Sequence, residues 1–115
     1  MHLKIRLAAG AAMGLWMGAA AAQSTEGGLA LAQQKACMAC HQVDSKRVGP
    51  PLQSVAERYA GQGEAMVGYL AEKIRGGGRG AWGVVPMPAQ AQVSDQEARQ
   101  LALWILSLAP AKAEN

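Results

Sequence analysis

The sequence contains no phenylalanine, and its aromatic side chains are limited to three tryptophans and two tyrosines. Alanine and glycine are abundant instead. A chain of this length has room for one domain, and a small domain with so few bulky side chains buries little apolar surface. The composition therefore indicates a thin core unless a bulky non-protein group completes it.

Strand-like alternation of apolar and polar residues is also missing, and no segment repeats. Runs of residues suited to helices are present, so we expect an all-α fold. The chain has 11 Lys+Arg against 8 Asp+Glu, but they form no basic run. Two of the cations lie in the first 22 residues, so residues 23–115 hold 9 against 8. This near-balance gives no reason to expect nucleic acid as a partner.

The first 22 residues have the layout of a secretory signal peptide. Residues 1–6 carry His, Lys and Arg, and residues 7–22 are apolar, rich in Ala and Gly, and end in Ala20, Ala21 and Ala22, which offer a small-residue cleavage site. A membrane anchor is the alternative, but these 16 apolar residues fall short of the ~20 strongly apolar residues that span a bilayer. We therefore predict cleavage after residue 22, export to the periplasm, and a domain at 23–115 with no membrane insertion after cleavage.

Four helical segments are expected in that domain. They are Leu29–His41, Leu52–Tyr59, Glu64–Arg75 and a last segment that follows Ser94 and stops at Pro110. Ser94 and Glu97 form a capping-box pattern at the start of the last segment, and prolines or glycines separate the others. The loop of about 17 residues between the third and fourth segments is a long connection of the kind that usually carries function.

The stretch Cys37-Met38-Ala39-Cys40-His41 admits several chemistries. A disulfide in an exported protein would use both cysteines but leave His41 unexplained. A structural zinc site needs four ligands, and residues 23–115 contain no other cysteine or histidine. A thioredoxin-type dithiol normally lies near a βαβ pattern, for which this sequence offers no strands. Covalent haem attachment uses the whole pattern, because two thiols three apart reach one porphyrin edge and the histidine faces the iron. We therefore predict one haem c bound through Cys37 and Cys40, with His41 on the iron.

Haem iron has a second axial position, and a methionine is the candidate for it because His2 leaves with the leader. Met38 lies inside the attachment motif, and Met66 has helical spacing with core positions. Met87 lies in the long loop between two prolines, 46 residues after His41. Gap filling in the loop is the alternative role. Ligation by histidine and methionine raises the reduction potential and fills both axial positions, so we expect one-electron transfer and no enzyme activity.

These residues resemble a known family, the small bacterial class I cytochromes c of the short, monohaem, periplasmic type. The resemblance runs from about Leu29 to Leu108 and rests on the segments CMACH, VGPPLQSVAERYAG, YLAEKIRGGGRGAWGVVPMP and VSDQEARQLALWILSL. It implies a cytochrome c fold of about four helices wrapped round one covalently attached haem c. His41 and Met87 would be the axial ligands.

The resemblance also implies roles for four further residues. The carbonyl of Pro50 would accept a hydrogen bond from the proximal imidazole, which fixes the ring. The indole N–H of Trp82 would meet a haem propionate, and Lys73 would be a basic partner of a propionate. Gln90, three residues after the predicted methionine ligand, would reach its sulfur. Loop packing for Trp82 and a solvated helix position for Lys73 are the alternatives.

Two positions depart from the pattern of the family. Arg47 puts a charge at the expected haem edge, where an apolar residue is common, and Ala32 is smaller than the aromatic often found on the first helix. The expected docking surface is a small apolar patch of Met38, Ala39, Val48, Val84, Val85, Pro86, Pro88 and Ala89, with Lys35 and Arg47 at its border. Weak electron-transfer encounters use small interfaces of this kind.

The implied function is that of a monomeric periplasmic electron carrier. Redox proteins would dock at its exposed haem edge, with a membrane cytochrome complex as donor and a periplasmic reductase or terminal oxidase as acceptor. Two alternatives stay open. One is a dedicated haem c subunit of a periplasmic dehydrogenase or reductase, and the other is a haem enzyme or gas sensor with an open sixth site.

Overall fold

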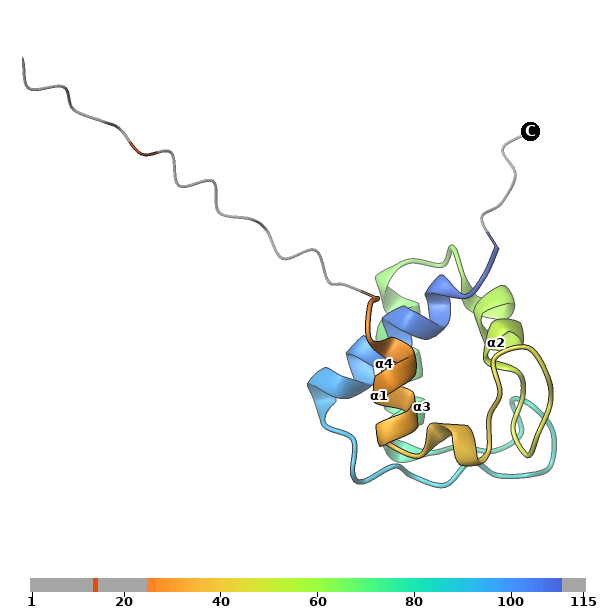
Figure 1. Cartoon of the computed structure of the whole chain (residues 1–115). Helices are drawn as coiled ribbons and strands as arrows, with labels where there is room; N and C mark the ends of the chain where they lie inside the picture. Colours follow the sequence, from red (N-terminus) through yellow and green to blue (C-terminus); the bar gives the residue numbers. More distant parts are fainter. Residues whose placement is uncertain (1–13, 15–24, 111–115) are drawn as a thin grey trace, which may run out of the picture.

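The computed structural model describes residue 14 and residues 25–110, so all but one residue of the predicted signal peptide at 1–22 lies outside the described part. Four α-helices and one 3-10 turn make up its regular structure (Figure 1). They are α1 Gly28–Gln34, η1 Cys37–Ala39, α2 Leu52–Tyr59, α3 Glu64–Gly76 and α4 Asp95–Ser107. Within residues 25–110 the β-type pairing is limited to one isolated bridge, Gly78 with Met87. The all-α prediction of about four helices is confirmed.

Helix α4 forms the centre of the core and contacts α1, α2 and α3. Its buried face carries Leu101, Trp104 and Ile105, as its helical spacing predicts. At Gly28 the backbone of α1 lies directly on the indole, because a Cβ there would come within 2.0 Å of Trp104 Cγ. The absence of a side chain at this glycine lets α1 cross close to α4 (Figure 1). None of the helices in the described ranges is long and apolar enough to span a bilayer.

Local sequence signals explain most helix ends. The hydroxyl of Ser94 accepts a hydrogen bond from the Glu97 backbone N–H at 3.1 Å, and the Glu97 carboxylate accepts one from the Ser94 N–H at 3.0 Å. The predicted capping box is therefore present. Helix α2 has its predicted bounds, and α3 extends one residue beyond its prediction. Helix α3 buries Val67 where we expected Met66. Both Met66 and Val67 fit a helical period, and Val67 is the one that is buried when α3 packs against α4.

The first predicted helix, Leu29–His41, is wrong in its C-terminal half. Helix α1 ends at Gln34, and Ala36 has φ 63°, in the left-handed region. A right-handed helix does not continue through such a residue. The 3-10 turn that follows directs the attachment stretch toward the interior. The residues after Gln34 have good helix propensity, but tertiary packing overrides that propensity here.

Candidate functional site

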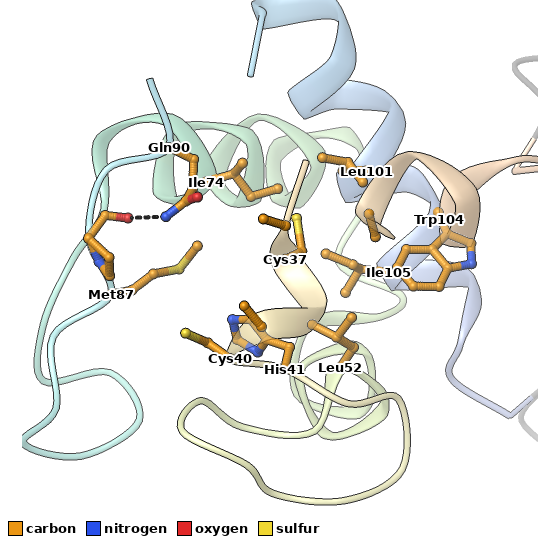
Figure 2. A pocket seen from close by; sticks show the side chains of 14 residues that line it. Cys37, Cys40, His41, Leu52, Ile74, Met87, Gln90, Leu101, Trp104 and Ile105 are labelled. Carbon is orange, nitrogen blue, oxygen red and sulfur yellow. Dashed lines mark hydrogen bonds between the residues drawn. The ribbon is translucent and has the colours of Figure 1, made fainter. Parts of the chain in front are cut away.

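A mostly apolar cavity lies between the 3-10 turn, the helices and the segment 86–90 (Figure 2). Its apolar wall includes Leu52 of α2, Ile74 of α3, and Leu101, Trp104 and Ile105 of α4. The cavity contains ≈ 830 Å³ of empty space, part of which is open to solvent. A hollow in the middle of so small a core agrees with the aromatic-poor composition. Its lining suits a flat, largely hydrophobic molecule.

Both thiols of the attachment stretch line this cavity, and both are free. Cys37 is half-buried and Cys40 is exposed. Burial raises the pKa of the Cys37 thiol above its ordinary value, which favours its protonated form. The His41 backbone N–H donates to the Cys37 carbonyl at 3.0 Å and holds the turn. Both thiols therefore lie on the wall of the cavity, where attachment of a molecule inside it would require them.

The zinc alternative lacks its ligands. Among the described residues, no three His, Cys, Asp or Glu side chains gather as a metal site. A closed zinc site needs four such ligands in a tetrahedron. The cavity instead offers two thiols, one imidazole and one thioether within an apolar wall. This donor set suits a metal that arrives already held by a large organic ring.

The ring of His41 is held by two residues that follow it by eight and nine positions in the chain, Gly49 and Pro50. Its Nδ1 lies 2.9 Å from the carbonyl oxygen of Pro50. A carbonyl can only accept, so Nδ1 is the donor, and in the neutral ring with this tautomer Nε2 presents a lone pair. Gly49 packs against the same ring, because a Cβ there would lie 2.5 Å from Cε1. The contact predicted for Pro50 is therefore present, and it leaves Nε2 ready to act as a metal ligand.

The side chain of Met87 enters the cavity from a different segment (Figure 2). Its backbone exchanges two hydrogen bonds with Gly78, at 3.0 Å and 2.8 Å. Gly77 has φ +70°, and a Cβ there would lie 2.4 Å from the Met87 carbonyl oxygen. Ile74 accepts a further backbone bond from Gln90 at 3.1 Å. The thioether is thus presented by a loop that is bonded to the end of α3.

Gln90 also lines the cavity, but its amide is engaged in the loop itself. Its Nε2 donates to the Pro88 carbonyl at 2.9 Å, as Figure 2 shows. Its Oε1 accepts a bond from Gln92 Nε2 at 2.8 Å. The contact with the Met87 sulfur, implied by the family resemblance, remains a prediction.

Trp82 and Lys73 lie outside the cavity lining. The Arg58 guanidinium stacks on the Trp82 ring at 3.4 Å from its centroid, and its Nη1 donates to the Ala81 carbonyl at 2.7 Å. The Lys73 ammonium lies 5.5 Å from the centroid of the Tyr69 ring. These are packing and surface contacts, as the alternatives for both residues describe. The propionate contacts remain predictions.

The expected docking patch is only partly an exposed surface. Val48, Val84 and Val85 are 52 %, 97 % and 61 % exposed, which is unusual for valine. Met38, by contrast, packs against the core. Lys35 pairs with Glu97 at 2.9 Å, which directs its ammonium toward α4 and away from the expected border. Ala39, Pro86, Pro88 and Ala89 are exposed as well, so Met38 is the one residue of the expected apolar patch that is partly buried.

Sequence reasoning missed three residues that shape the site. Gly49 and Gly77 matter because of what lies beside them, and Arg58 because it covers Trp82. The glycines had a visible signal, since each lies in a segment that carries the family resemblance. Arg58 lies in such a segment too, but its residue type gave no signal, because a basic residue at the end of a short helix is common on solvated surfaces.

Comparison with known proteins agrees with this geometry. The sequence profile of the family Cytochrome c matches residues 25–109. Cytochrome c-552 of Hydrogenobacter thermophilus is 59 % identical over 78 residues, which cover 68 % of this chain and 78 % of the relative. Cytochrome c-551 of Pseudomonas aeruginosa is 49 % identical over 77 residues, covering 67 % and 72 %.

Solved structures place the fold in the same group. The crystal structure of wild-type Nitrosomonas europaea cytochrome c552 matches with a TM-score of 0.67 and 49 % identity, covering 70 % of this chain and 98 % of that one. The match includes the part of the chain that surrounds the cavity, and the family implies a covalently bound haem c and interaction with redox partners. The chain belongs to the cytochrome c family, as a small class I electron-transfer protein similar to the c-551 and c-552 cytochromes.

Proposed function

We propose that this protein is a periplasmic carrier of single electrons, which uses one haem c bound through Cys37 and Cys40 and ligated by His41 and Met87. One observation carries the proposal. An imidazole with a free Nε2 and a thioether reach the same apolar cavity from segments 46 residues apart, and two free thiols line it. These are the groups that covalent attachment and two-sided iron ligation require.

The chain fits this group residue by residue. Each thiol would add across one vinyl group, its sulfur bonding to one carbon and its hydrogen going to the other, with no leaving group. The Pro50 carbonyl keeps the proton on Nδ1 of His41, so that Nε2 stays available. Leu52, Ile74 and Ile105 exclude water from the space between. When bound, the haem iron supplies a centre that gains or loses one electron.

Two axial side chains explain why we propose a carrier and no enzyme. Catalysis at an iron needs a position that a substrate can enter, and a haem held by both His41 and Met87 would offer no such position. A soft thioether also favours ferrous iron and raises the reduction potential. Met87 faces into the cavity, which supports its role as a ligand over the gas-sensor alternative, in which it does not bind the iron.

The proposed place of work is the periplasm, and the proposed docking surface is the exposed valine patch. The leader-like residues 1–22 support export. Val48, Val84 and Val85, with Arg47 beside Val48 in the chain, offer a small apolar face with a charged rim. Such faces suit short encounters, in which rim charge speeds association more than it tightens binding. We propose a monomer that takes electrons from a membrane cytochrome complex and delivers them to a periplasmic reductase or terminal oxidase.

Replacing Met87 tests the ligand assignment. In the haem-loaded Met87→Ala protein we expect loss of the methionine-to-iron charge-transfer band, ready carbon monoxide binding and a lower reduction potential. Met66→Ala is the matched control, since Met66 is partly buried on α3 and does not line the cavity. It should keep all three properties. A Met87→Ala protein with an unchanged band and potential would refute the assignment.

Replacing both cysteines tests the attachment. Haem should separate from the Cys37→Ala, Cys40→Ala double variant when the protein is denatured, whereas it should stay with the wild-type chain. Retention by the double variant would contradict covalent attachment.

Mass spectrometry of the periplasmic fraction of the host should find a mature chain that begins at Gln23, and a protein found only at full length would contradict the predicted cleavage.

A further inference from the structure

The loop that presents Met87 makes a reciprocal pair of hydrogen bonds with the end of α1. Gln92 Nε2 donates to the Lys35 carbonyl at 3.0 Å, and Lys35 Nζ donates to the Gln92 carbonyl at 3.3 Å. The two residues are 57 positions apart in sequence. Such a pair costs considerable chain entropy to form, and it joins two segments that belong to no common helix.

The same amide continues toward the methionine. Gln92 Nε2 also donates to Gln90 Oε1 at 2.8 Å, and Gln90 Nε2 donates to the Pro88 carbonyl at 2.9 Å. Both N–H groups of the Gln92 amide are therefore used, one toward Lys35 and one toward Gln90. The resulting chain of bonds runs from the cap of α1 to the residue directly after Met87.

Lys35 is a firm anchor for this chain. Its ammonium pairs with the Glu97 carboxylate at 2.9 Å, and both side chains are only 24 % and 29 % exposed. Lys35 is also the C-cap residue of α1, two positions before Cys37. The anchor thus lies next to the segment that carries both thiols and the histidine.

The loop between α3 and α4 presents Met87, and we call it the methionine loop. Its other hydrogen bonds connect it to α3 and to the residues just after α3. Met87 pairs with Gly78, the Gln90 N–H donates to Ile74, and the Val93 carbonyl accepts from Arg75 Nε at 3.2 Å. All three partners lie in α3 or just after it. These bonds fix the loop against one wall of the cavity. The bonds of Gln92 fix it against the opposite, thiol-bearing segment, so they set the separation between the two.

We propose that Gln92 is a positioning residue for Met87, with Lys35 as its anchor, and that this pair holds the thioether on the iron against competing ligands. The inference rests on the proposed function, since it assumes that Met87 is an axial ligand. Gln92 does not line the cavity, so it would not touch the iron itself. It acts by limiting how far the loop can move away from the attachment segment.

The test measures how tightly imidazole displaces the methionine in the oxidised, haem-loaded protein. Gln92→Leu keeps the approximate size of the side chain and removes all of its hydrogen bonds. Since one lost hydrogen bond corresponds to about fivefold in an equilibrium, we expect imidazole to bind about fivefold to twentyfold more tightly. Gln62→Leu is the matched control, because among the described residues the Gln62 side chain donates to the Arg58 carbonyl alone, at 3.1 Å and within its own segment.

A second pair of variants distinguishes the positioning role of Gln92 from a general effect on stability. Lys35→Met removes the ammonium but keeps the carbonyl, so imidazole should bind more tightly than in wild type but less tightly than in Gln92→Leu. Lys35→Arg restores a donor and should recover most of the wild-type affinity. If these substitutions acted only by destabilising the fold, each variant would unfold at a lower urea concentration. The imidazole affinities would then not follow the order given above.

Met87→Ala in the same titration separates the two proposals. If Met87→Ala binds imidazole freely and Gln92→Leu binds it as wild type does, the positioning role is refuted and the ligand assignment stands. If Met87→Ala also behaves as wild type, the ligand assignment itself fails. Tighter binding in Gln92→Leu together with an unchanged Gln62→Leu supports the positioning role.

Discussion

The two sides of the cavity are built in different ways. On the histidine side, His41 is held by Pro50 and Gly49, and the Cys40 carbonyl accepts bonds from Val48 and Gly49 at 3.1 Å and 2.8 Å. All of these contacts lie within a short stretch of chain. On the methionine side, the loop depends on α3, on the bridge at Gly78 and on Lys35, which is far away in sequence.

This difference predicts where the molecule opens first. A segment that closes on itself keeps its geometry while distant elements move. A loop held by long-range contacts, with residues 79–86 all exposed, loses its geometry when any of those contacts breaks. We therefore expect the methionine side to release before the histidine side.

The largest effect should come from Gly77→Ala, which disrupts the methionine side. Gly77 has φ +70° and ψ −172°, a backbone region almost restricted to glycine. A Cβ there would also meet the Met87 carbonyl at 2.4 Å. Strain and clash together should lower the free energy of unfolding by about 3 kcal/mol. Urea denaturation measures this loss, and the methionine-to-iron band should weaken with it.

Gly76→Ala is the matched control for that change. Gly76 is the adjacent residue at the end of α3, and a Cβ there meets nothing within 4 Å. Its unfolding free energy should stay equal or rise by up to about 1 kcal/mol, as for glycine replaced by alanine in a helix. Equal losses in the two variants would contradict the role given to Gly77.

The next effect should come from Gly49→Ala, which disrupts the histidine side. The new Cβ would lie 2.5 Å from Cε1 of His41, so the ring must shift away from Pro50. Overpacking of this kind should cost about 2 kcal/mol. Imidazole should not bind more tightly, because the methionine loop is unaffected. Chemical shifts of the His41 ring protons and urea denaturation provide the measurements, with Gly68→Ala, in open space on α3, as the control.

Ala36→Gly should slightly raise the stability of the histidine side. Ala36 has φ 63°, where an alanine is strained by roughly 1–2 kcal/mol. Glycine removes the strain but adds freedom to the unfolded chain, so stability should rise by about 0.5 kcal/mol. Ala39→Gly, in the same turn without a positive φ, should instead lose stability. A loss in both variants would show that Ala36 is not strained.

The sequence allowed a good prediction of which side chains meet at the cavity, namely Cys37, Cys40, His41 and Met87, and a weaker one of the local geometry. The stretch CMACH and the proline-flanked Met87 carry their chemistry in residue type and spacing, so the side chains could be named in advance. The bounds of α2 and the start of α4 followed from prolines and the capping box, which act locally. These are signals that a short window of sequence contains.

What escaped prediction depends on neighbours that are distant in the chain. The positive φ of Ala36 is imposed by packing and left no trace in residue type. The need for glycine at 77 arises from the loop that passes over it, and the stacking of Arg58 on Trp82 joins positions 24 residues apart. The choice of Val67 over Met66 likewise came from the face of α4 that α3 meets.

The smallest effect should be the pH dependence of the anchor that joins the two sides. The Ser94 backbone N–H, and after it the Lys35 ammonium, lower the pKa of the Glu97 carboxyl below its ordinary value. A lowered folded-state pKa adds stability above the unfolded pKa, and this stability is lost as the pH falls through the folded value. Glu97→Gln can keep the capping-box bond but loses the charge. Wild type should therefore be slightly more stable than Glu97→Gln at pH 7. Urea denaturation at stepwise lower pH should show the difference shrink below the ordinary pKa of glutamate and vanish once the pH lies below the lowered pKa of Glu97, and a difference that persisted there would contradict the charge-based explanation.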